Sequence, residues 1–334
     1  MGKKRFVGKF LVFALVMVFS LSFMCQSAFS SSVVHLKASS GDNDDYPAVM
    51  GLYKFAELVE ARTNGQVTVD VYSKGTLYGD QREEVEAVKN QTIAFSLPQV
   101  SVLSSWDPKV DFFSMPYLFS GTEHAERVID SSTGKKIFAD LGKYDLVVLS
   151  SFTAGGMRSF YNSARPIKTA ADMKGMTLRT TSSPLFIEAI KALGGIPTPI
   201  SWGELYTALQ QKVVDGAEHS PIDVMLYNFD EACQYYSLDE HTYDLIPLVG
   251  NTKIIGKLDK KYQDIIYQSA LDAQTWERNY ANGQAKDAIA TLEKRGMKIN
   301  KVDKDSFYKK VIGVNKAYAK KLGIDIYDEI ISQR

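Results

Sequence analysis

Strand-like and helix-like stretches alternate along the chain from Val33 to its end, and this alternation is what most constrains the fold. Alternating valines predict a strand over 66–72, and apolar residues at helical spacing predict a helix before it, over 46–63. A further helix is expected over 80–89. Strands that alternate with helices are typical of α/β proteins, and this first run predicts an open sheet.

The rest of the chain continues the same pattern. Apolar residues at helical spacing extend over 259–295, which predicts one unusually long helix. The remaining strands are predicted over 33–38, 92–97, 146–152, 157–162, 176–180 and 297–302, and 241–249 with 252–258 is predicted to be a returning strand and loop. The remaining helices are predicted over 122–141, 170–174, 181–194, 202–212 and 303–331.

A chain of 334 residues is long enough for two packed lobes. Gly155 and Gly156 follow the strand predicted over 146–152, and glycine tolerates the torsion changes that a hinge requires. We therefore predict that the chain crosses from one lobe to the other at these glycines.

In open sheets, ligands lie beyond the carboxyl ends of the strands. The loop over 40–45, which includes Asn43, falls at such an end, as do Gln81 and Gln99. All three side chains are amides, so the first lobe is expected to offer neutral hydrogen-bonding groups.

Two arginines, Arg158 and Arg179, lie in stretches whose other residues are typical of buried strands. A guanidinium keeps its charge, so it needs an anion or several acceptors when it leaves water. One interpretation is a pocket for the carboxylate of a ligand, and the other is a pair of ion pairs with internal acids. The residues alone leave both open.

The N-terminus has the pattern of a secretory signal peptide over 1–30. Four cations in the first nine residues precede an apolar run over 10–24, and small residues follow at 28–30. The run is shorter than the roughly 20 residues that a membrane-spanning helix needs. Lipidation at Cys25 is the alternative, which the bulky Met24 disfavours.

Charge and cysteine content exclude some classes of function. The chain has 39 basic and 39 acidic residues, and loss of the signal peptide would leave 35 against 39, so there is no basic surplus for nucleic acid. Cys233 would then be the one remaining cysteine, which excludes an internal disulfide. We expect it to be a packed side chain rather than a nucleophile.

Several motifs occur in order along the chain. They are Leu77-Tyr-Gly-Asp-Gln-Arg-Glu83, Met115-Pro-Tyr-Leu-Phe119, Gly156-Met-Arg158, Met173-Lys-Gly-Met-Thr-Leu-Arg179, Pro197-Thr-Pro-Ile-Ser-Trp-Gly-Glu-Leu-Tyr-Thr-Ala-Leu-Gln210 and Val214-Asp-Gly-Ala-Glu218. With these motifs, the chain resembles the DctP-type solute-binding proteins of TRAP (tripartite ATP-independent periplasmic) transporters.

The resemblance implies a two-lobed periplasmic-binding-protein clamshell, in which each lobe is an open sheet flanked by helices and one long helix spans both. Lobe I is expected over 31–154 and 242–280, and lobe II over 155–241 and 281–334. Such a protein captures a small organic acid in the periplasm and delivers it to an integral membrane TRAP permease. A monomer without a cofactor and without metal-binding residues of its own is expected, and the sequence does not determine whether a metal ion bridges the bound ligand.

The resemblance also implies roles for particular residues. The arginine at the position of Arg179 binds the ligand carboxylate in this family, and Arg158 assists it. Trp202 would lie against the carbon skeleton of the ligand, and Tyr206 would add a hydroxyl one helical turn later.

Gln81 and Gln99 match positions that bind the far end of the ligand. His219 stands where asparagine is common; as a bare residue it would be a loop histidine. His241 is either a ligand contact or a residue at a helix end. The amides favour a sugar acid such as a uronate, with a C4-dicarboxylate or a 2-oxo acid as alternatives because Arg158 would suit a second carboxylate.

Two other classes compete with a binding protein. The sequence lacks the common motifs of hydrolases, nucleotide-binding enzymes and zinc enzymes, and Glu83 and Glu84 are expected to face solvent at a helix start. A secreted enzyme with an unrecognised site is therefore the minor alternative. A soluble ligand-sensing partner of a signalling kinase is the other.

Overall fold

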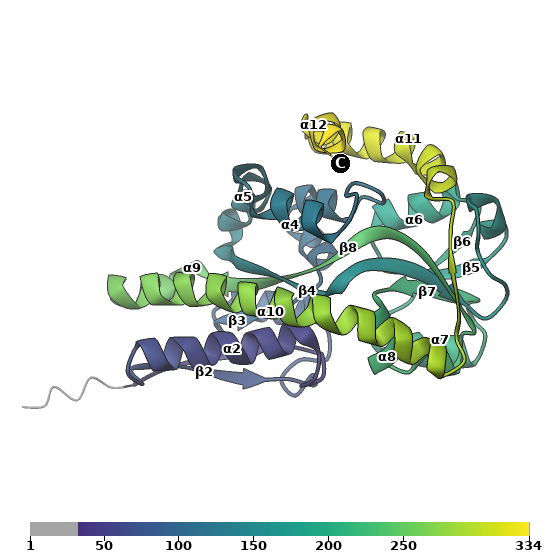
Figure 1. Cartoon of the computed structure of the whole chain (residues 1–334). Coiled ribbons are helices and arrows are strands. Elements are labelled where there is room, and N and C mark those ends of the chain that lie inside the picture. Colours follow the sequence, from purple (N-terminus) through teal and green to yellow (C-terminus); the bar gives the residue numbers. More distant parts are fainter. Residues whose placement is uncertain (1–32, 334) are drawn as a thin grey trace, which may run out of the picture. The chain divides into compact units, whose positions relative to one another are not determined.

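A computed structural model of the chain describes residues 33–333, so the predicted signal peptide and Cys25 lie outside the described residues. Within them, helices flank one nine-stranded sheet (Figure 1), which confirms the predicted α/β class. In sheet order the strands are β2 (Val67–Tyr72), β1 (Val34–Ser39), β3 (Phe95–Ser96), β8 (Tyr235–Asn251), β4 (Leu146–Asn162), β7 (Gly216–His219), β5 (Thr177–Thr180) and β6 (Ile196–Pro199), and β9 (Lys298–Lys301) pairs with β8.

The first five elements form the open-sheet unit that the sequence predicts. α2 (Pro47–Arg62) packs an apolar stripe against the sheet, and α3 (Gln81–Lys89) begins at the side-chain cap of Asp80. β1 and β3 are parallel, with Ser39 opposite Ser96. The carboxyl ends of both strands therefore lie at the same edge of the sheet.

Two long antiparallel strands, β4 and β8, run through the middle of the sheet and join its two halves. Their register shifts between Thr153 and Met157, where Gly155 and Gly156 have φ of 111° and 88°. The sequence predicts two strands separated by these glycines. The structure has one strand, because the ladder absorbs the left-handed residues as a local irregularity.

The second half of the sheet contains two strands, β6 and β7, that the sequence analysis does not predict. Both have four residues, and prolines occupy two positions of β6. β5 is parallel to both, and β7 is antiparallel to β4. The helices of this half are α6 (Pro184–Ala192), α7 (Leu205–Gln210) and α8 (Pro221–Leu226).

Capping residues divide two predicted helices. The helix predicted over 122–141 is α4 (Thr122–Asp130) and α5 (Ser132–Ala139), because the side chain of Ser131 accepts from the backbone of Gly134 and starts a new helix. The helix predicted over 303–331 is α11 (Lys304–Leu322) and α12 (Tyr327–Ser332).

Gly323 ends α11 with φ of 67°, a left-handed conformation that terminates helices. Of the returning strand and loop predicted over 241–249 and 252–258, the strand lies within β8, whereas the second stretch contains a short helix, α9 (Thr252–Gly256), which Asn251 caps. The remaining 3₁₀ segments are Val100–Ser105, Pro108–Ser114, Asp140–Tyr144, Ala170–Met173, Trp202–Glu204 and Phe229–Glu231.

The predicted long helix is confirmed as α10 (Lys260–Lys294), which contacts α2, β4 and α8 and so spans both halves of the sheet (Figure 1). Its Gln274 accepts a hydrogen bond from the backbone of Ser151 at 2.6 Å, and Glu277 accepts from Thr153. None of the helices within residues 33–333 is both long and apolar enough to cross a membrane.

Candidate ligand-binding site

Arg179 lies on β5 and is almost fully buried, with 4% of the residue exposed. Its Nε donates to the backbone oxygen of Ile200 at 3.0 Å, and its Nη1 lies 3.4 Å from Nε2 of His219. A guanidinium has five N–H groups, so three donors remain on the two terminal nitrogens. Among residues 33–333, no carboxylate forms an ion pair with Arg179, and burial lowers its pKa.

His219 lies at the end of β7. It is therefore a strand residue and not the loop histidine that the residue alone predicts. Burial, and then the positive charge of Arg158, lower its pKa well below the usual range, and the ring is neutral. Because Arg179 only donates, Nε2 is the acceptor, and Nδ1 faces the Tyr161 hydroxyl at 3.0 Å. The ring therefore holds the guanidinium from one side.

The rings of Trp202 and Tyr227 form an aromatic wall that connects His219 to the first half of the sheet. The ring of Trp202 lies 5.1 Å from that of His219 and 4.7 Å from that of Tyr227. The Tyr227 hydroxyl donates to Oδ1 of Asp42 at 2.8 Å. Tyr227 and Asp42 belong to no sequence motif; only the position of the loop over 40–45, at the end of a strand, indicated part of this region.

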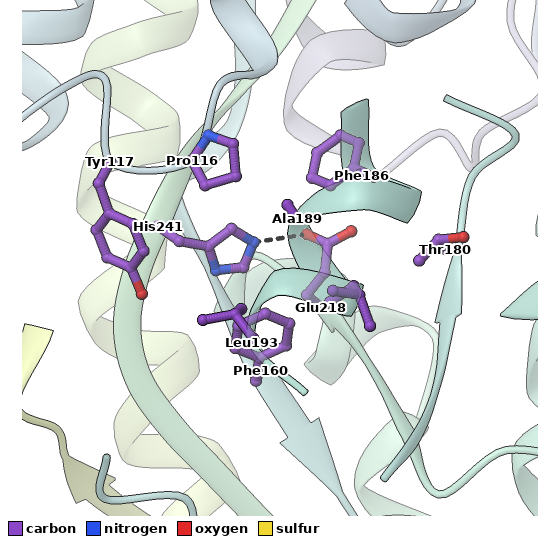
Figure 2. A pocket seen from close by; sticks show the side chains of 10 residues that line it. Pro116, Tyr117, Phe160, Thr180, Phe186, Ala189, Leu193, Glu218 and His241 are labelled. Carbon is purple, nitrogen blue, oxygen red and sulfur yellow. Dashed lines mark ion pairs between the residues drawn. The ribbon is translucent and has the colours of Figure 1, made fainter. Parts of the chain in front are cut away.

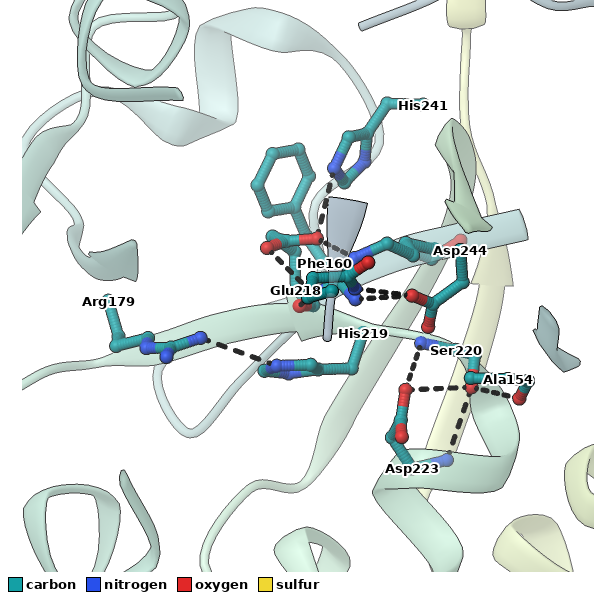
Figure 3. A network of polar contacts seen from close by, with 12 residues as sticks. Ala154, Phe160, Arg179, Glu218, His219, Ser220, Asp223, His241 and Asp244 are labelled. Atoms are coloured by element: carbon teal, nitrogen blue, oxygen red, sulfur yellow. Dashed lines mark hydrogen bonds and ion pairs between the residues drawn. The ribbon is translucent and has the colours of Figure 1, made fainter. Parts of the chain in front are cut away.

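Arg158 forms ion pairs with buried acidic residues of the chain itself (Figure 3). Its Nε and Nη2 donate to the two carboxylate oxygens of Glu218 at 2.7 and 3.0 Å, and Nη1 donates to Asp244 at 2.9 Å. Nη2 also donates to the backbone oxygen of Glu218. Burial opposes its charge, but Asp244 and Glu218 raise its pKa above the usual range. Of the two interpretations offered by the sequence, a ligand pocket or ion pairs with internal acids, the second therefore describes Arg158.

His241 lies within β8, so the prediction of a helix-end position is wrong. Its Nδ1 is 2.8 Å from Asp239, its Nε2 is 3.4 Å from Glu218, and its ring stacks on Phe160. Burial disfavours the charged ring, but Asp239 and Glu218 outweigh burial and raise its pKa to about 9. Both ring nitrogens thus face carboxylates.

Figure 2 shows a mainly apolar pocket beside His241, lined also by Phe160, Phe186 and Leu193. Thr180 lines it and the adjacent Arg179 does not. Successive side chains of a strand point to opposite faces, so the pocket lies on the other face of β5 from the Arg179 guanidinium. We therefore place the candidate ligand site around Arg179 and not in this pocket.

The two glutamines come together at the edge of the first half. Oε1 of Gln81 accepts from the backbone of Gln99 at 2.9 Å, and Nε2 of Gln99 donates to Asp244 at 2.6 Å. Asp244 links them to Arg158. Asn43 is partly exposed in the loop over 40–45, where its carbonyl accepts from the backbone of Tyr46.

The structure does not bring Tyr206 to this cluster. It is 37% exposed, and its hydroxyl donates to Glu231 at 2.6 Å. The prediction assumed one α-helical turn between Trp202 and Tyr206. Trp202 instead lies in a 3₁₀ segment that precedes α7, so the two side chains do not share a face.

Sequence reasoning missed several buried carboxyls, among them Asp42, Glu84, Asp223 and Asp244. Glu84 corrects an explicit expectation, because it is fully buried although Glu83 beside it is exposed. A signal was present, since Glu84 lies four residues before the buried Val88 and so shares its helix face. Its Oε1 accepts from Ser39, and its Oε2 has no partner among the described residues.

Replacing Glu84 by glutamine should stabilise the protein at neutral and alkaline pH. Burial, partly offset by the hydrogen bond from Ser39, raises the pKa of Glu84 from 4.5 to about 8. Protonation therefore favours folding; this contribution is fully present below pH 4.5 and is lost as the pH rises to about 8. Glutamine cannot ionise, so its gain in unfolding free energy should grow with pH to on the order of 4 kcal/mol.

Urea unfolding of wild type, Glu84→Gln and the exposed control Glu83→Gln, from about pH 4 to about pH 8.5, measures this difference. We expect the control to follow the wild type. A stability difference for Glu84→Gln that does not depend on pH would contradict the assignment.

Cys233 is buried, and burial raises the pKa of its thiol to about 12, consistent with a packed side chain. Over residues 33–333, the structure has no group of three His, Cys, Asp or Glu side chains arranged to hold a metal ion. The cluster around Arg179 is suited to binding an anion, because its guanidinium has donors without acceptors among the described residues and an aromatic wall lies beside it.

Comparison with known proteins agrees with this geometry. Residues 38–321 match the family "bacterial extracellular solute-binding protein, family 7", called DctP. The 2,3-diketo-L-gulonate-binding periplasmic protein YiaO of Escherichia coli K12 is 30% identical over 76% of this chain and 77% of its own length. The C4-dicarboxylate-binding protein DctB of Bacillus subtilis is 24% identical over 87% of this chain and 84% of its own.

Solved structures are also similar over most of the chain. A TRAP periplasmic solute-binding protein of Roseobacter denitrificans with bound β-D-glucuronate has a TM-score of 0.84 and 28% identity, covering 89% of this chain and 98% of that one. One from Chromohalobacter salexigens with bound D-glucuronate has a TM-score of 0.85 and 27% identity, covering 90% and 100%. The chain therefore belongs to the DctP family, the two-lobed solute-binding proteins of TRAP transporters.

Proposed function

We propose that this chain captures a small organic acid by its carboxylate and that Arg179 is the anchor. The observation that carries the proposal is the set of three unused donors on a guanidinium that is almost fully buried. A buried cation without an anion is unfavourable, and a carboxylate pairs with two guanidinium nitrogens in a planar fork. Trp202, beside His219, is positioned to pack against the carbon skeleton of the ligand.

The proposed ligand is a sugar acid such as a uronate. The two glucuronate-bound neighbours and the diketogulonate-binding relative support this class. The C4-dicarboxylate-binding relative makes a dicarboxylate the second candidate, and a 2-oxo acid is the third. Arg158 was the reason to expect a second carboxylate; four of its five donors are used by Glu218 and Asp244, which favours one carboxylate.

Members of this family bind small acidic ligands in the periplasm and work with TRAP permeases. The finer proposal for this chain is that a signal peptide over 1–30 is cleaved during secretion. The mature protein would then act as a monomer and hand its ligand to the integral membrane subunits of a permease.

Capture requires two lobes that close, and we place lobe I at 31–154 and 242–280 and lobe II at 155–241 and 281–334. The irregular stretch of β4 at Gly155 and Gly156 supports a hinge there. The hydrogen bond from Tyr227 to Asp42 joins the second lobe to the first. A ligand drives closure only by binding the closed form better, and a carboxylate on Arg179 would supply that difference.

A thermal-shift screen of the mature chain against uronates, aldonates, dicarboxylates and 2-oxo acids tests this function. We expect the largest rise in melting temperature with a uronate or an aldonate, because binding to the folded state stabilises it. Stabilisation by succinate or malate alone would overturn the sugar-acid assignment. The absence of any shift with all four classes would contradict the capture of an organic acid.

A further inference from the structure

Three buried carboxyls lie next to the proposed ligand site. Asp42, Asp223 and Asp244 are 5%, 2% and 0% exposed, and they come from a loop, from α8 and from β8. Asp223 lies against Asp244, and Asp42 is close enough to Asp244 for repulsion between their charges (Figure 3 shows the first pair). Carboxyls from three distant parts of the chain therefore converge at one place.

One cation neutralises this group only in part. Nη1 of Arg158 contacts Asp244, but the other contacts of that guanidinium go to Glu218. In the part of the chain that the structure describes, no Lys or Arg forms an ion pair with Asp42 or Asp223. Oδ2 of Asp244 is also buried without a hydrogen-bond donor from residues 33–333.

The carboxyls and Arg179 are connected by the same residues. Trp202 touches His219, which holds Arg179, and it also touches Tyr227, which donates to Asp42. A ligand anchored on Arg179 and lying along Trp202 would therefore extend toward the acids. The three unused donors of Arg179 are an independent sign that a ligand binds here.

We propose that Asp42, Asp223 and Asp244 set the specificity of this site, admitting an acid with one carboxylate and hydroxyl donors at its other end and rejecting an acid with a second carboxylate. This inference rests on the proposed function, because it takes Arg179 as the anchor of the first carboxylate.

The physical reason is that ionised carboxyls carry negative charge and accept hydrogen bonds. Ionised carboxylates only accept hydrogen bonds, so a ligand hydroxyl complements the unpartnered Oδ2 of Asp244, whereas a ligand carboxylate cannot. Repulsion already exists without a ligand. Burial, and then the charge of Asp244, raise the pKa of Asp42 to about 6 despite the hydrogen bond from Tyr227.

The test compares ligands that differ only at the far end: D-gluconate with D-glucarate, and D-erythronate with meso-tartrate. Isothermal titration calorimetry gives the ratio of affinities for the monoacid and the diacid of each pair. We expect the wild type to prefer the monoacid by about 100-fold, because the second carboxylate of the diacid would lie beside like charge in a partly shielded site. Asp42→Asn should narrow the ratio by about tenfold, mainly through tighter binding of the diacid.

Three further variants separate charge from structure. Asp45→Asn, an exposed change in the same loop, should keep the wild-type ratio. Tyr227→Phe removes the hydrogen bond that lowers the pKa of Asp42, so Asp42 carries less charge near neutral pH and the ratio should narrow in the same direction as in Asp42→Asn. If Asp42→Asn does not fold, Asp42→Ser removes the same charge with a smaller polar side chain.

A wild type that binds the diacid as tightly as the monoacid would overturn the inference and leave the capture of organic acids intact. So would a ratio that no folded variant of Asp42 narrows. Failure of the wild type to bind any monoacid or diacid, in contrast, would contradict the proposed function itself.

Discussion

Replacement of Arg179 by alanine should abolish the thermal stabilisation that an organic acid gives to the wild-type protein. Each charge-assisted hydrogen bond contributes roughly 1.5 to 3 kcal/mol, so loss of a two-bond fork should weaken binding by about 100-fold or more. Arg179→Lys should also bind poorly, because an ammonium is a point charge and cannot form the fork. Calorimetric titration with the best acid from the thermal-shift screen measures both variants.

Arg82→Ala is the matched control, since Arg82 is exposed at the start of α3 next to Gln81. It removes the same charge and should bind like the wild type. Wild-type affinity in Arg179→Ala would rule out Arg179 as the anchor. Arg179→Met should in addition lose little stability without ligand, because it removes a buried cation that has no ion pair within residues 33–333.

Arg158→Met, in contrast, should strongly destabilise the protein. Arg158 pairs with Glu218 and Asp244, and its removal leaves two buried carboxylates without their cation. Breaking a buried ion pair by removing one partner typically costs about 3–5 kcal/mol. Urea unfolding of the ligand-free protein, compared with wild type, measures this loss.

The pair of methionine variants makes the contrast sharp. Both variants replace a buried arginine of the sheet, Arg158 on β4 or Arg179 on β5, with a side chain of similar length. We expect Arg158→Met to lose stability, whereas Arg179→Met loses binding. Equal destabilisation by both variants would mean that Arg179 is as structural as Arg158 and would remove the main support for an anion site.

Periodicity predicted the elements that are long and amphipathic, such as α2, α3 and α10. It failed where a single residue changes the path of the chain, as Ser131 does between α4 and α5 and Gly323 does after α11. It also missed β6, in which two of four residues are prolines, and β7, although it found β5 and β9, which are equally short. Helix caps and such short strands are decided by hydrogen bonds that a hydrophobic pattern does not record.

The motifs and the family resemblance pointed to Arg179, His219 and Trp202, and the structure brings these three together. Tyr227 and Asp42 were not predicted, because their contact joins residues far apart in the sequence and depends on the fold. Glu84 was predictable from its helix face. Tyr206 was assigned on a helical turn that a 3₁₀ segment replaces.

The most direct test of the central claim is a crystal structure of the mature protein with the acid that stabilises it most. The account predicts that both carboxylate oxygens of the ligand lie about 3 Å from terminal nitrogens of Arg179, with the carbon skeleton against Trp202. A ligand carboxylate bound to Arg158, or in the apolar pocket beside His241, would contradict it.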